Sequence, residues 1–255
     1  MKSVVASTIR SAFEYQGQKC SACSRVYVPE SLWGEVKEGL VETQKSLKVG
    51  PATEADSFMS AVIDKKAFQR LSGYIEHAKA SPNCSIVAGG GYDDSVGFFV
   101  EPTIVETTTP EDRIFKEEIF GPLVSVYVYN DKDCMDTLKS IGDHTPYALT
   151  GALYCQDQYV YSFEIFMNPF HSTLNFFRQF ADEAAVLLKG TAGNFYVNDK
   201  STGSVVGQQP FGGARLSGTN DKAGGPHYML KWASAQSVKQ TFVPLHGVNY
   251  PYMRK

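Results

Sequence analysis

The sequence predicts an α/β fold, an open sheet with flanking helices. Amphipathic segments with helical spacing of apolar residues alternate along the chain with short runs of β-branched and aromatic residues. The size agrees with such a fold. A chain of 255 residues, 43% hydrophobic and 20% charged, has enough apolar material to bury a core in one large domain or two.

The expected elements follow in chain order. Val4, Val5, Ile9 and Phe13 recur at helical spacing, so a first helix is expected to end just before Cys20, with Gly17 as its stop signal. Further helices are expected around residues 33–41 and 68–78, each with charges on the opposite face, and a short helix between residues 131 and 141. The expected strands are residues 24–28, 85–87, 98–105, 123–129, 149–154 and 194–197. The triple glycine at 89–91 does not open a helix after a strand and indicates a turn.

Charge and cysteine usage exclude several classes of protein. The net charge of −3 and the absence of a Lys/Arg block give no footprint for nucleic acid or an anionic membrane surface, so neither partner is expected. Charged residues and an Asn-Pro pair interrupt the most apolar window, 161–180, so no membrane span is expected. The odd, scattered set of five cysteines predicts free thiols in a reducing compartment. No targeting signal is visible at the N-terminus.

Cys20 is the candidate nucleophile. It lies between small or polar neighbours at an expected helix-to-strand junction, where a side chain can face a cleft, although most single cysteines are inert and partly buried. Cys20 and Cys23 also form a CxxC pair, which is found in redox dithiols and in zinc sites. No second CxxC or suitably spaced histidine pair follows, and we therefore expect no metal site.

Three motifs carry a family resemblance. Residues 13–25, with Gly17-Gln18-Lys19-Cys20, resemble the active-site signature of the aldehyde dehydrogenases, and residues 117–122 and 193–199 resemble two further signatures in the family's order. The loops at 203–204, 208–215 and 218–222 resemble the glutamate-semialdehyde branch of that family.

The resemblance implies a domain organisation. Residues 1–235 would form the family's catalytic domain and residues 236–255 an oligomerisation strand with a tail, so that the protein would be a homo-oligomer, a dimer in the intact family. The family's Rossmann-like cofactor domain is expected upstream of Cys20 and is absent from this sequence. A Phe-rich stretch at 161–182 has no counterpart in the family, whose helix resumes at Glu183. Mitochondrial matrix is the family's usual location.

The resemblance also assigns roles to residues. Cys20 would attack L-glutamate 5-semialdehyde, the open form of pyrroline-5-carboxylate, and NAD⁺ would accept the hydride, leaving a thioester that water converts to L-glutamate. Glu118 and Phe120 resemble the residues that contact the nicotinamide ribose of NAD. Four other residues would bind the amino-acid end of the substrate. These are Ser21, Gly203, Ser204 and Phe211.

Several of these residues are also compatible with a purely structural role. Glu117 is read as a surface charge, Phe120 is equally compatible with a core position, and the Gly203–Ser204 loop can be a turn without a ligand. If the first helix ends just before Cys20, its dipole disfavours the thiolate, and Lys19 is then either an activating cation or a solvated side chain.

Three hypotheses of function remain open. The family's general base and asparagine oxyanion donor have no counterpart here, so the chain alone is expected to be inactive although it belongs with an enzyme. The second hypothesis is a non-catalytic fragment that associates with full-length subunits. The third is a thiol-redox protein that uses Cys20 and Cys23.

Overall fold

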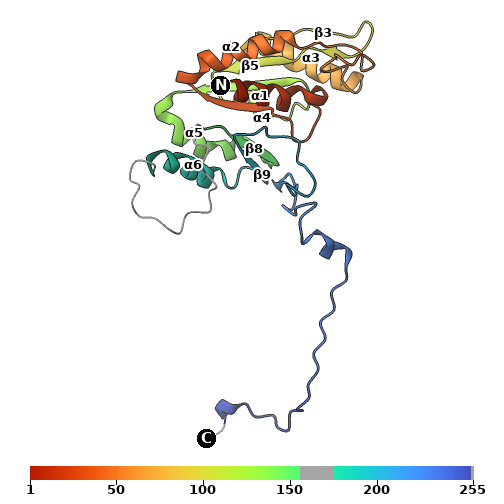
Figure 1. The fold of residues 1–255 in the computed structure, drawn as a ribbon, viewed down its shortest axis with the longest axis vertical. Helices are drawn as coiled ribbons and strands as arrows, with labels where there is room; N and C mark the ends of the chain where they lie inside the picture. The colour runs from red at the N-terminus through yellow and green to blue at the C-terminus, as the bar shows by residue number, and fades with distance from the viewer. Residues whose placement is uncertain (156–174, 254–255) are drawn as a thin grey trace.

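The structure, a computed structural model, describes residues 1–155 and 175–253. Its main body is a four-stranded sheet covered by helices, and a smaller unit of two parallel strands and two helices lies beside it (Figure 1). The expected α/β class is confirmed. Within these ranges no helix is both long enough and apolar enough to cross a membrane.

The main sheet has the strand order β1-β6-β5-β2. Strand β1 (Arg25–Pro29) runs parallel to β6 (Leu123–Tyr129), β6 runs parallel to β5 (Thr103–Thr107), and β2 (Cys84–Ala88) joins antiparallel at the edge. A two-stranded hairpin of β3 (Tyr92–Asp93) and β4 (Phe99–Val100) follows β2. The expected single strand 98–105 is therefore wrong: it is split into β4 and β5 at Glu101-Pro102, because proline has no N–H to donate to a ladder.

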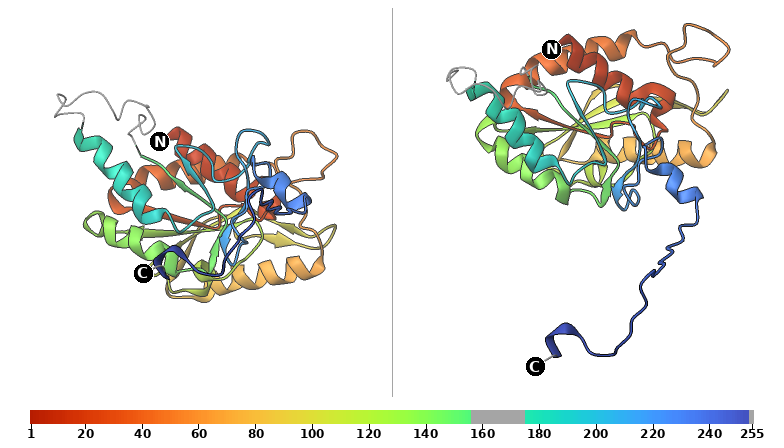
Figure 2. Two further views of the ribbon diagram at one scale, coloured as in Figure 1. Left: turned by 90° about the horizontal axis from the view of Figure 1, so that it is seen from below. Right: turned by 60° about the horizontal axis from the view of Figure 1, so that its bottom comes forward.

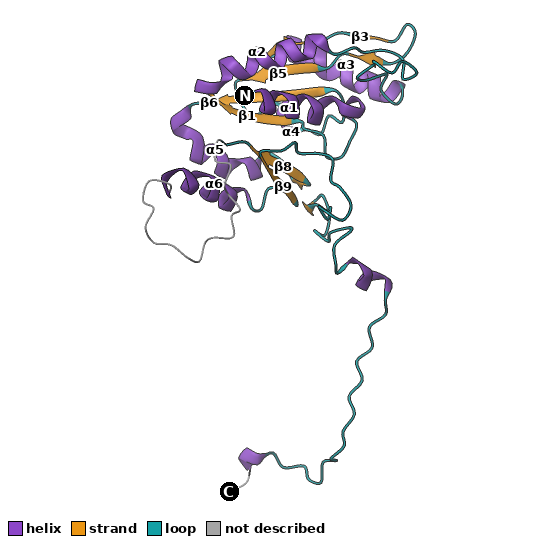
Figure 3. Cartoon of the chain, viewed as in Figure 1, coloured by secondary structure: helices purple, strands orange, loops and turns teal. Residues whose placement is uncertain are grey.

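Helices cover both faces of this sheet (Figures 2 and 3). Helices α1 (Lys2–Phe13) and α2 (Glu30–Ser46) pack on one face, against Ile104, Val124 and Val126. Helix α3 (Lys65–Ala80) packs on the other face against Val105 and Leu123, so alternate residues of β5 and β6 enter opposite cores. The expected helices at 33–41 and 68–78 are confirmed.

The first helix ends earlier than expected. Helix α1 stops at Phe13, and the 3-10 turn η1 (Glu14–Gly17) follows, with Tyr15 and Gln16 in the left-handed region. The prediction that the helix ends just before Cys20 is wrong, because two non-glycine residues adopt a conformation that the spacing of apolar residues does not reveal.

The second unit holds the remaining regular elements. Strand β8 (Thr150–Leu153) pairs parallel with β9 (Asn194–Val197), and the short helix α5 (Cys134–Ser140) packs on α6 (Asn175–Leu188). Two-residue strands β7 (Tyr147–Ala148) and β10 (Ala214–Arg215) pair antiparallel. Residues 161–174 of the atypical stretch lie outside the described residues. Helix α6 begins at Asn175, inside the atypical stretch, and continues through Glu183, where the resemblance to the family's helix resumes.

The chain leaves the body near its C-terminus and runs away from it (Figure 1). Every residue from Met229 onward whose exposure is described is exposed, including Phe242 and Leu245. Between the short helical turns at 228–232 and 251–253 this segment forms no strand in the described structure, so the oligomerisation strand at 237–243 stays a prediction.

Candidate active site

The turn before Cys20 is held by a close contact between two motifs. Gly17 has φ +62°, and a Cβ on it would lie 2.3 Å from the carbonyl oxygen of Gly121. A side chain at position 17 is therefore excluded by conformation and by space. This contact joins the first signature, which carries Cys20, to the second signature at 117–122.

Cys20 is exposed to solvent, whereas the other cysteines are partly buried. Since α1 ends at Phe13, six residues separate its carbonyl end from Cys20, and a helix dipole acts only within the last turn. The expected unfavourable dipole at the thiolate is thus removed. Cys23 differs, because burial raises the pKa of its thiol to about 11 and its Sγ lies 3.5 Å from the Arg25 carbonyl oxygen. A buried thiol of that pKa is a poor partner in a redox dithiol.

Lys19 is partly buried, and its ammonium is paired with a carboxylate. Its ammonium lies 3.2 Å from a carboxylate oxygen of Glu14 and 5.8 Å from the ring centroid of Tyr15. Partial burial raises the pKa of Glu14, but hydrogen bonds from Arg10 and Lys19 outweigh it and hold the pKa below its ordinary value. Glu14 is therefore an anion shared by Arg10, Lys19 and Lys200, and it offsets the charge of Lys19 only in part.

The second signature places Glu118 and Phe120 on the surface. Both are exposed, while Ile119 between them is buried and anchors the segment. Phe120 has φ +53°, and Arg70 donates hydrogen bonds of 3.2 Å to the carbonyl oxygens of Ile119 and Phe120. The core alternative for the Phe120 ring is thus wrong, because 39% of the residue is exposed.

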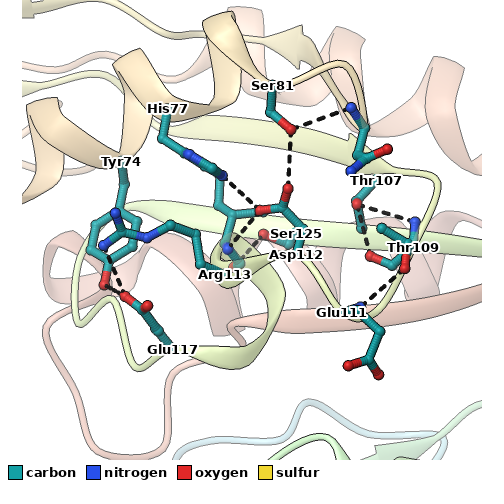
Figure 4. A network of polar contacts seen from close by, with 12 residues as sticks. Tyr74, His77, Ser81, Thr107, Thr109, Glu111, Asp112, Arg113, Glu117 and Ser125 are labelled. Atoms are coloured by element: carbon teal, nitrogen blue, oxygen red, sulfur yellow. Dashed lines mark hydrogen bonds and ion pairs between the residues drawn. The ribbon is translucent and has the colours of Figure 1, made fainter.

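Glu117 belongs to a polar network with residues of α3 and α4 (Figure 4). It accepts hydrogen bonds from Tyr74 and from Arg113, the latter at 3.0 Å. Its reading as a surface charge is confirmed, with the addition that it ties the segment to α3. Glu118 instead lies near Arg25, whose pKa is lowered by burial and partly restored by interactions with Tyr27, Cys23 and Glu118.

A cleft of about 1060 Å³ unites the thiol with these residues. It runs between the main sheet and the β8–β9 unit, and Cys20, Glu118 and Phe120 all line it, together with Arg25. Ser21, Gly203, Ser204 and Phe211 do not line it. The structure therefore brings together the predicted nucleophile and the predicted cofactor residues in one cavity.

Ser21 and the Gly203–Ser204 loop meet next to this cleft, whose lining includes Cys20 and Ser201. The Ser21 hydroxyl lies 2.7 Å from that of Thr202, and both residues are buried. Gly203 has φ +85°, and the Ser204 hydroxyl donates a hydrogen bond of 2.6 Å to the carbonyl oxygen of Gln209. Three of the four predicted substrate residues are thus linked, through Thr202, which sequence reasoning missed.

Phe211 is positioned separately by the third signature. Its backbone pairs with Ala223 in both directions at 2.9 Å, and the Asn194 side chain bridges the residues on either side of it. The Lys222 ammonium lies 2.6 Å from the Gly193 carbonyl oxygen and 2.5 Å from that of Gly212. Lys222 therefore fastens the loop that carries Phe211 to the start of β9, a role that the resemblance of residues 218–222 did not assign to it.

Comparisons with known proteins agree with these motifs. A sequence model described as the aldehyde dehydrogenase family matches residues 1–163, so the match ends within the atypical stretch 161–182. The chain is 54% identical over 254 residues to the mitochondrial delta-1-pyrroline-5-carboxylate dehydrogenase of Danio rerio and 53% identical over 255 residues to that of Homo sapiens. These alignments cover 99% and 100% of the chain and 42% of each relative, so the chain spans about two fifths of the length of the curated relatives it matches.

Solved structures show the same likeness. The crystal structure of the Delta-pyrroline-5-carboxylate dehydrogenase from Mycobacterium tuberculosis matches with a TM-score of 0.80 at 43% identity, over 98% of this chain and 42% of that one. A second structure of that enzyme, bound with NAD, matches with a TM-score of 0.78 at 42% identity and the same coverage.

Proposed function

Because the chain belongs to the aldehyde dehydrogenase family, we propose that it supplies the thiol chemistry of a delta-1-pyrroline-5-carboxylate dehydrogenase, which oxidises L-glutamate 5-semialdehyde to L-glutamate in proline catabolism. One observation carries the proposal: exposed Cys20 shares a cleft with Glu118 and Phe120. The similarity to enzymes of that name supports the enzyme over the alternative of a non-catalytic fragment.

Cys20 is the proposed nucleophile because an aldehyde carries no leaving group. The thiolate adds to the aldehyde carbon, and the new alkoxide accepts a hydrogen bond from the backbone N–H of Cys20. Loss of hydride from that carbon converts the adduct to a thioester, and water releases L-glutamate. NAD⁺, when bound, accepts the hydride.

The residues of the second signature fit a nicotinamide ribose. The exposed Glu118 carboxylate offers two acceptor oxygens to a vicinal diol, and the exposed Phe120 ring offers a surface for packing. Both sit in a short segment whose backbone is held by Arg70, so little ordering is needed when a ligand binds.

The loop of Gly203 and Ser204, next to the cleft, is the proposed site for the amino-acid end of the substrate. Gly203 can present its backbone N–H to the α-carboxylate, with the hydroxyls of Ser21 and Ser204 as further partners. The Ser204 hydroxyl already donates to Gln209, so its oxygen is the group that remains to accept a bond from an α-ammonium. Phe211 provides the apolar wall for the methylenes.

Further parts of the proposal rest on the family. The general base and the surface for the adenosine of NAD are expected outside this sequence, and the segment 237–243 is proposed to pair with a second copy in a dimer. The mitochondrial matrix is the proposed location, in line with the relatives named mitochondrial.

The test is protection of thiols by the substrate. Iodoacetamide labelling of each cysteine is followed by peptide mass spectrometry, with glutamate semialdehyde, with propanal, or with neither. Glutamate semialdehyde should slow labelling of Cys20 more than propanal does and leave the partly buried Cys134 unchanged as a matched control. Equal effects on both cysteines, or none on Cys20, would contradict the proposal.

A further inference from the structure

Three metal-ligating side chains meet on the α3 side of the sheet, outside the cleft of Cys20. They are His77 in the last turn of α3, Cys84 at the start of β2, and Asp112, which precedes the short helix α4 (Arg113–Lys116). One ligand atom of each lies within 4.8 Å of the other two. None of the three lines the cleft.

The backbone fixes all three positions. The Ser81 N–H bonds the His77 carbonyl oxygen at 2.8 Å, and the Cys84 N–H bonds that of Ser81 at 3.2 Å. Cys84 pairs with Thr107 in the sheet, and Asp112 accepts the Ile114 N–H at 3.0 Å. The cluster therefore does not depend on flexible surface side chains that happen to lie near one another.

His77 and Ser81 both contact the carboxylate of Asp112 (Figure 4). His77 Nε2 lies 2.7 Å from Asp112 Oδ1, and the Ser81 hydroxyl donates to Asp112 Oδ2 at 3.0 Å. The Asp112 side chain is 6% exposed and the His77 side chain 28% exposed. The carboxylate is thus buried, and the imidazole faces the solvent from which an ion would enter.

In contrast to the expectation of no metal site, which considered only sequence spacing, we propose that His77, Cys84 and Asp112 bind one zinc ion or a similar divalent transition metal, with water as the fourth ligand. Imidazole nitrogen, thiolate sulfur and carboxylate oxygen are the donor types that zinc takes, at bond lengths of about 2.0–2.3 Å. Tetrahedral bonds of that length set the ligand atoms roughly 3.3–3.8 Å apart. The 2.7 Å contact of His77 Nε2 with Asp112 Oδ1 must therefore open by about 0.6–0.8 Å, which side-chain rotation supplies.

Metal binding releases one proton, from Cys84, and leaves one on His77. Cys84 releases its thiol proton to solvent, and a neutral His77 carries its proton on Nδ1 so that Nε2 can coordinate. Asp112 Oδ1 becomes a ligand, while Ser81 keeps its bond to Oδ2 and orients the carboxylate. The ion would tie α3, β2 and the start of α4 together, just ahead of the segment that carries Glu118.

Cobalt(II) titration tests the site, because a thiolate ligand gives a charge-transfer band in the near ultraviolet. The Cys20→Ala chain is used so that the exposed thiol does not contribute, which also keeps the result independent of the proposed function. One equivalent should produce the band, and zinc should abolish it by competition. His77→Gln or Cys84→Ser should weaken binding by at least about tenfold.

Matched controls are His246→Gln in the exposed C-terminal segment and Cys134→Ser, neither of which should change the titration. A second measurement needs no variant at the site: zinc should slow iodoacetamide labelling of Cys84 and leave Cys134 unaffected. This measurement decides the matter if circular dichroism shows Cys84→Ser to be unfolded. Cobalt uptake without a thiolate band, unchanged affinity in a folded Cys84→Ser chain, or no protection of Cys84 would each overturn the proposal.

Discussion

Replacement of Gly17 by alanine should destabilise the fold strongly. Its φ of +62° costs a residue with a Cβ about 1–2 kcal/mol. The new Cβ would lie 2.3 Å from the carbonyl oxygen of Gly121, and overpacking of a fitted contact typically costs about 1–3 kcal/mol. Because the obstacle is backbone, it cannot swing aside as a side chain can. We therefore expect a loss of about 2–5 kcal/mol in the free energy of unfolding.

Urea unfolding followed by circular dichroism measures this loss, with Gly73→Ala as the matched control. Gly73 lies inside α3, and a Cβ there would meet nothing within 4 Å. The same chemical change should stabilise that helix by roughly 0.5–1 kcal/mol, so the two variants should shift the midpoint in opposite directions. A Gly17→Ala chain as stable as the unmodified one would refute the reasoning, as would an equal loss in both variants.

The remaining predictions concern reactivity, turnover, assembly and pH. Iodoacetamide should label Cys20 faster than the other four cysteines, because Cys20 alone among them is exposed; equal rates would remove it as the nucleophile. The isolated chain should not reduce NAD⁺ with pyrroline-5-carboxylate, since a missing acid/base group costs roughly 10² to 10⁴ in rate and the adenosine has no expected surface here; spectrophotometric turnover abolished by Cys20→Ala would contradict this. Deletion of residues 236–255 should convert a dimer to a monomer in analytical ultracentrifugation without lowering the melting temperature of the body, and an unchanged mass would disprove the pairing. Burial raises the pKa of Asp112, but hydrogen bonds from Ile114, His77 and Ser81 outweigh burial and hold the pKa below its ordinary value of 3.8. The ionised Asp112 therefore stabilises the folded state above pH 3.8, and this stabilisation is lost as pH falls through the lowered pKa. In the Asp112→Asn chain, the urea midpoint of unfolding should decrease less steeply as the pH is lowered below 3.8 than in the unmodified chain.

Local pattern predicted most of the regular elements. The strands at 123–129 and 194–197 were expected with the bounds that the structure shows, because their runs of β-branched and aromatic residues are bordered by clear breaks. The two expectations that failed, the end of the first helix and the single strand at 98–105, failed because the backbone departs there from regular helix or strand conformation. Neither the left-handed pair before Gly17 nor the break at Glu101-Pro102 changes the periodicity of apolar residues around it.

The site was predicted through its motifs and not through its contacts. Cys20, Glu118 and Phe120 were expected together and do line one cleft. Thr202 was not expected, since it bonds Ser21, which is far from it in the sequence, and Lys222 was expected only as a member of the motif 218–222, without its bonds to Gly193 and Gly212. Side-chain hydrogen bonds between distant segments leave no periodic trace, and only three-dimensional packing reveals them.

The pairing of β1 with β6 determines when, during synthesis, the surroundings of Cys20 can fold. Their register sets Arg25 beside Ser125, so about a hundred residues must be synthesised before the strand that follows Cys20 finds its partner. Contacts of such separation close slowly, since the loop entropy is lost before the contact is gained. A nascent chain therefore carries the Cys20 turn for some time without the β1–β6 pairing, and the cleft that Cys20 shares with Glu118 and Phe120 can form only after those residues have been synthesised.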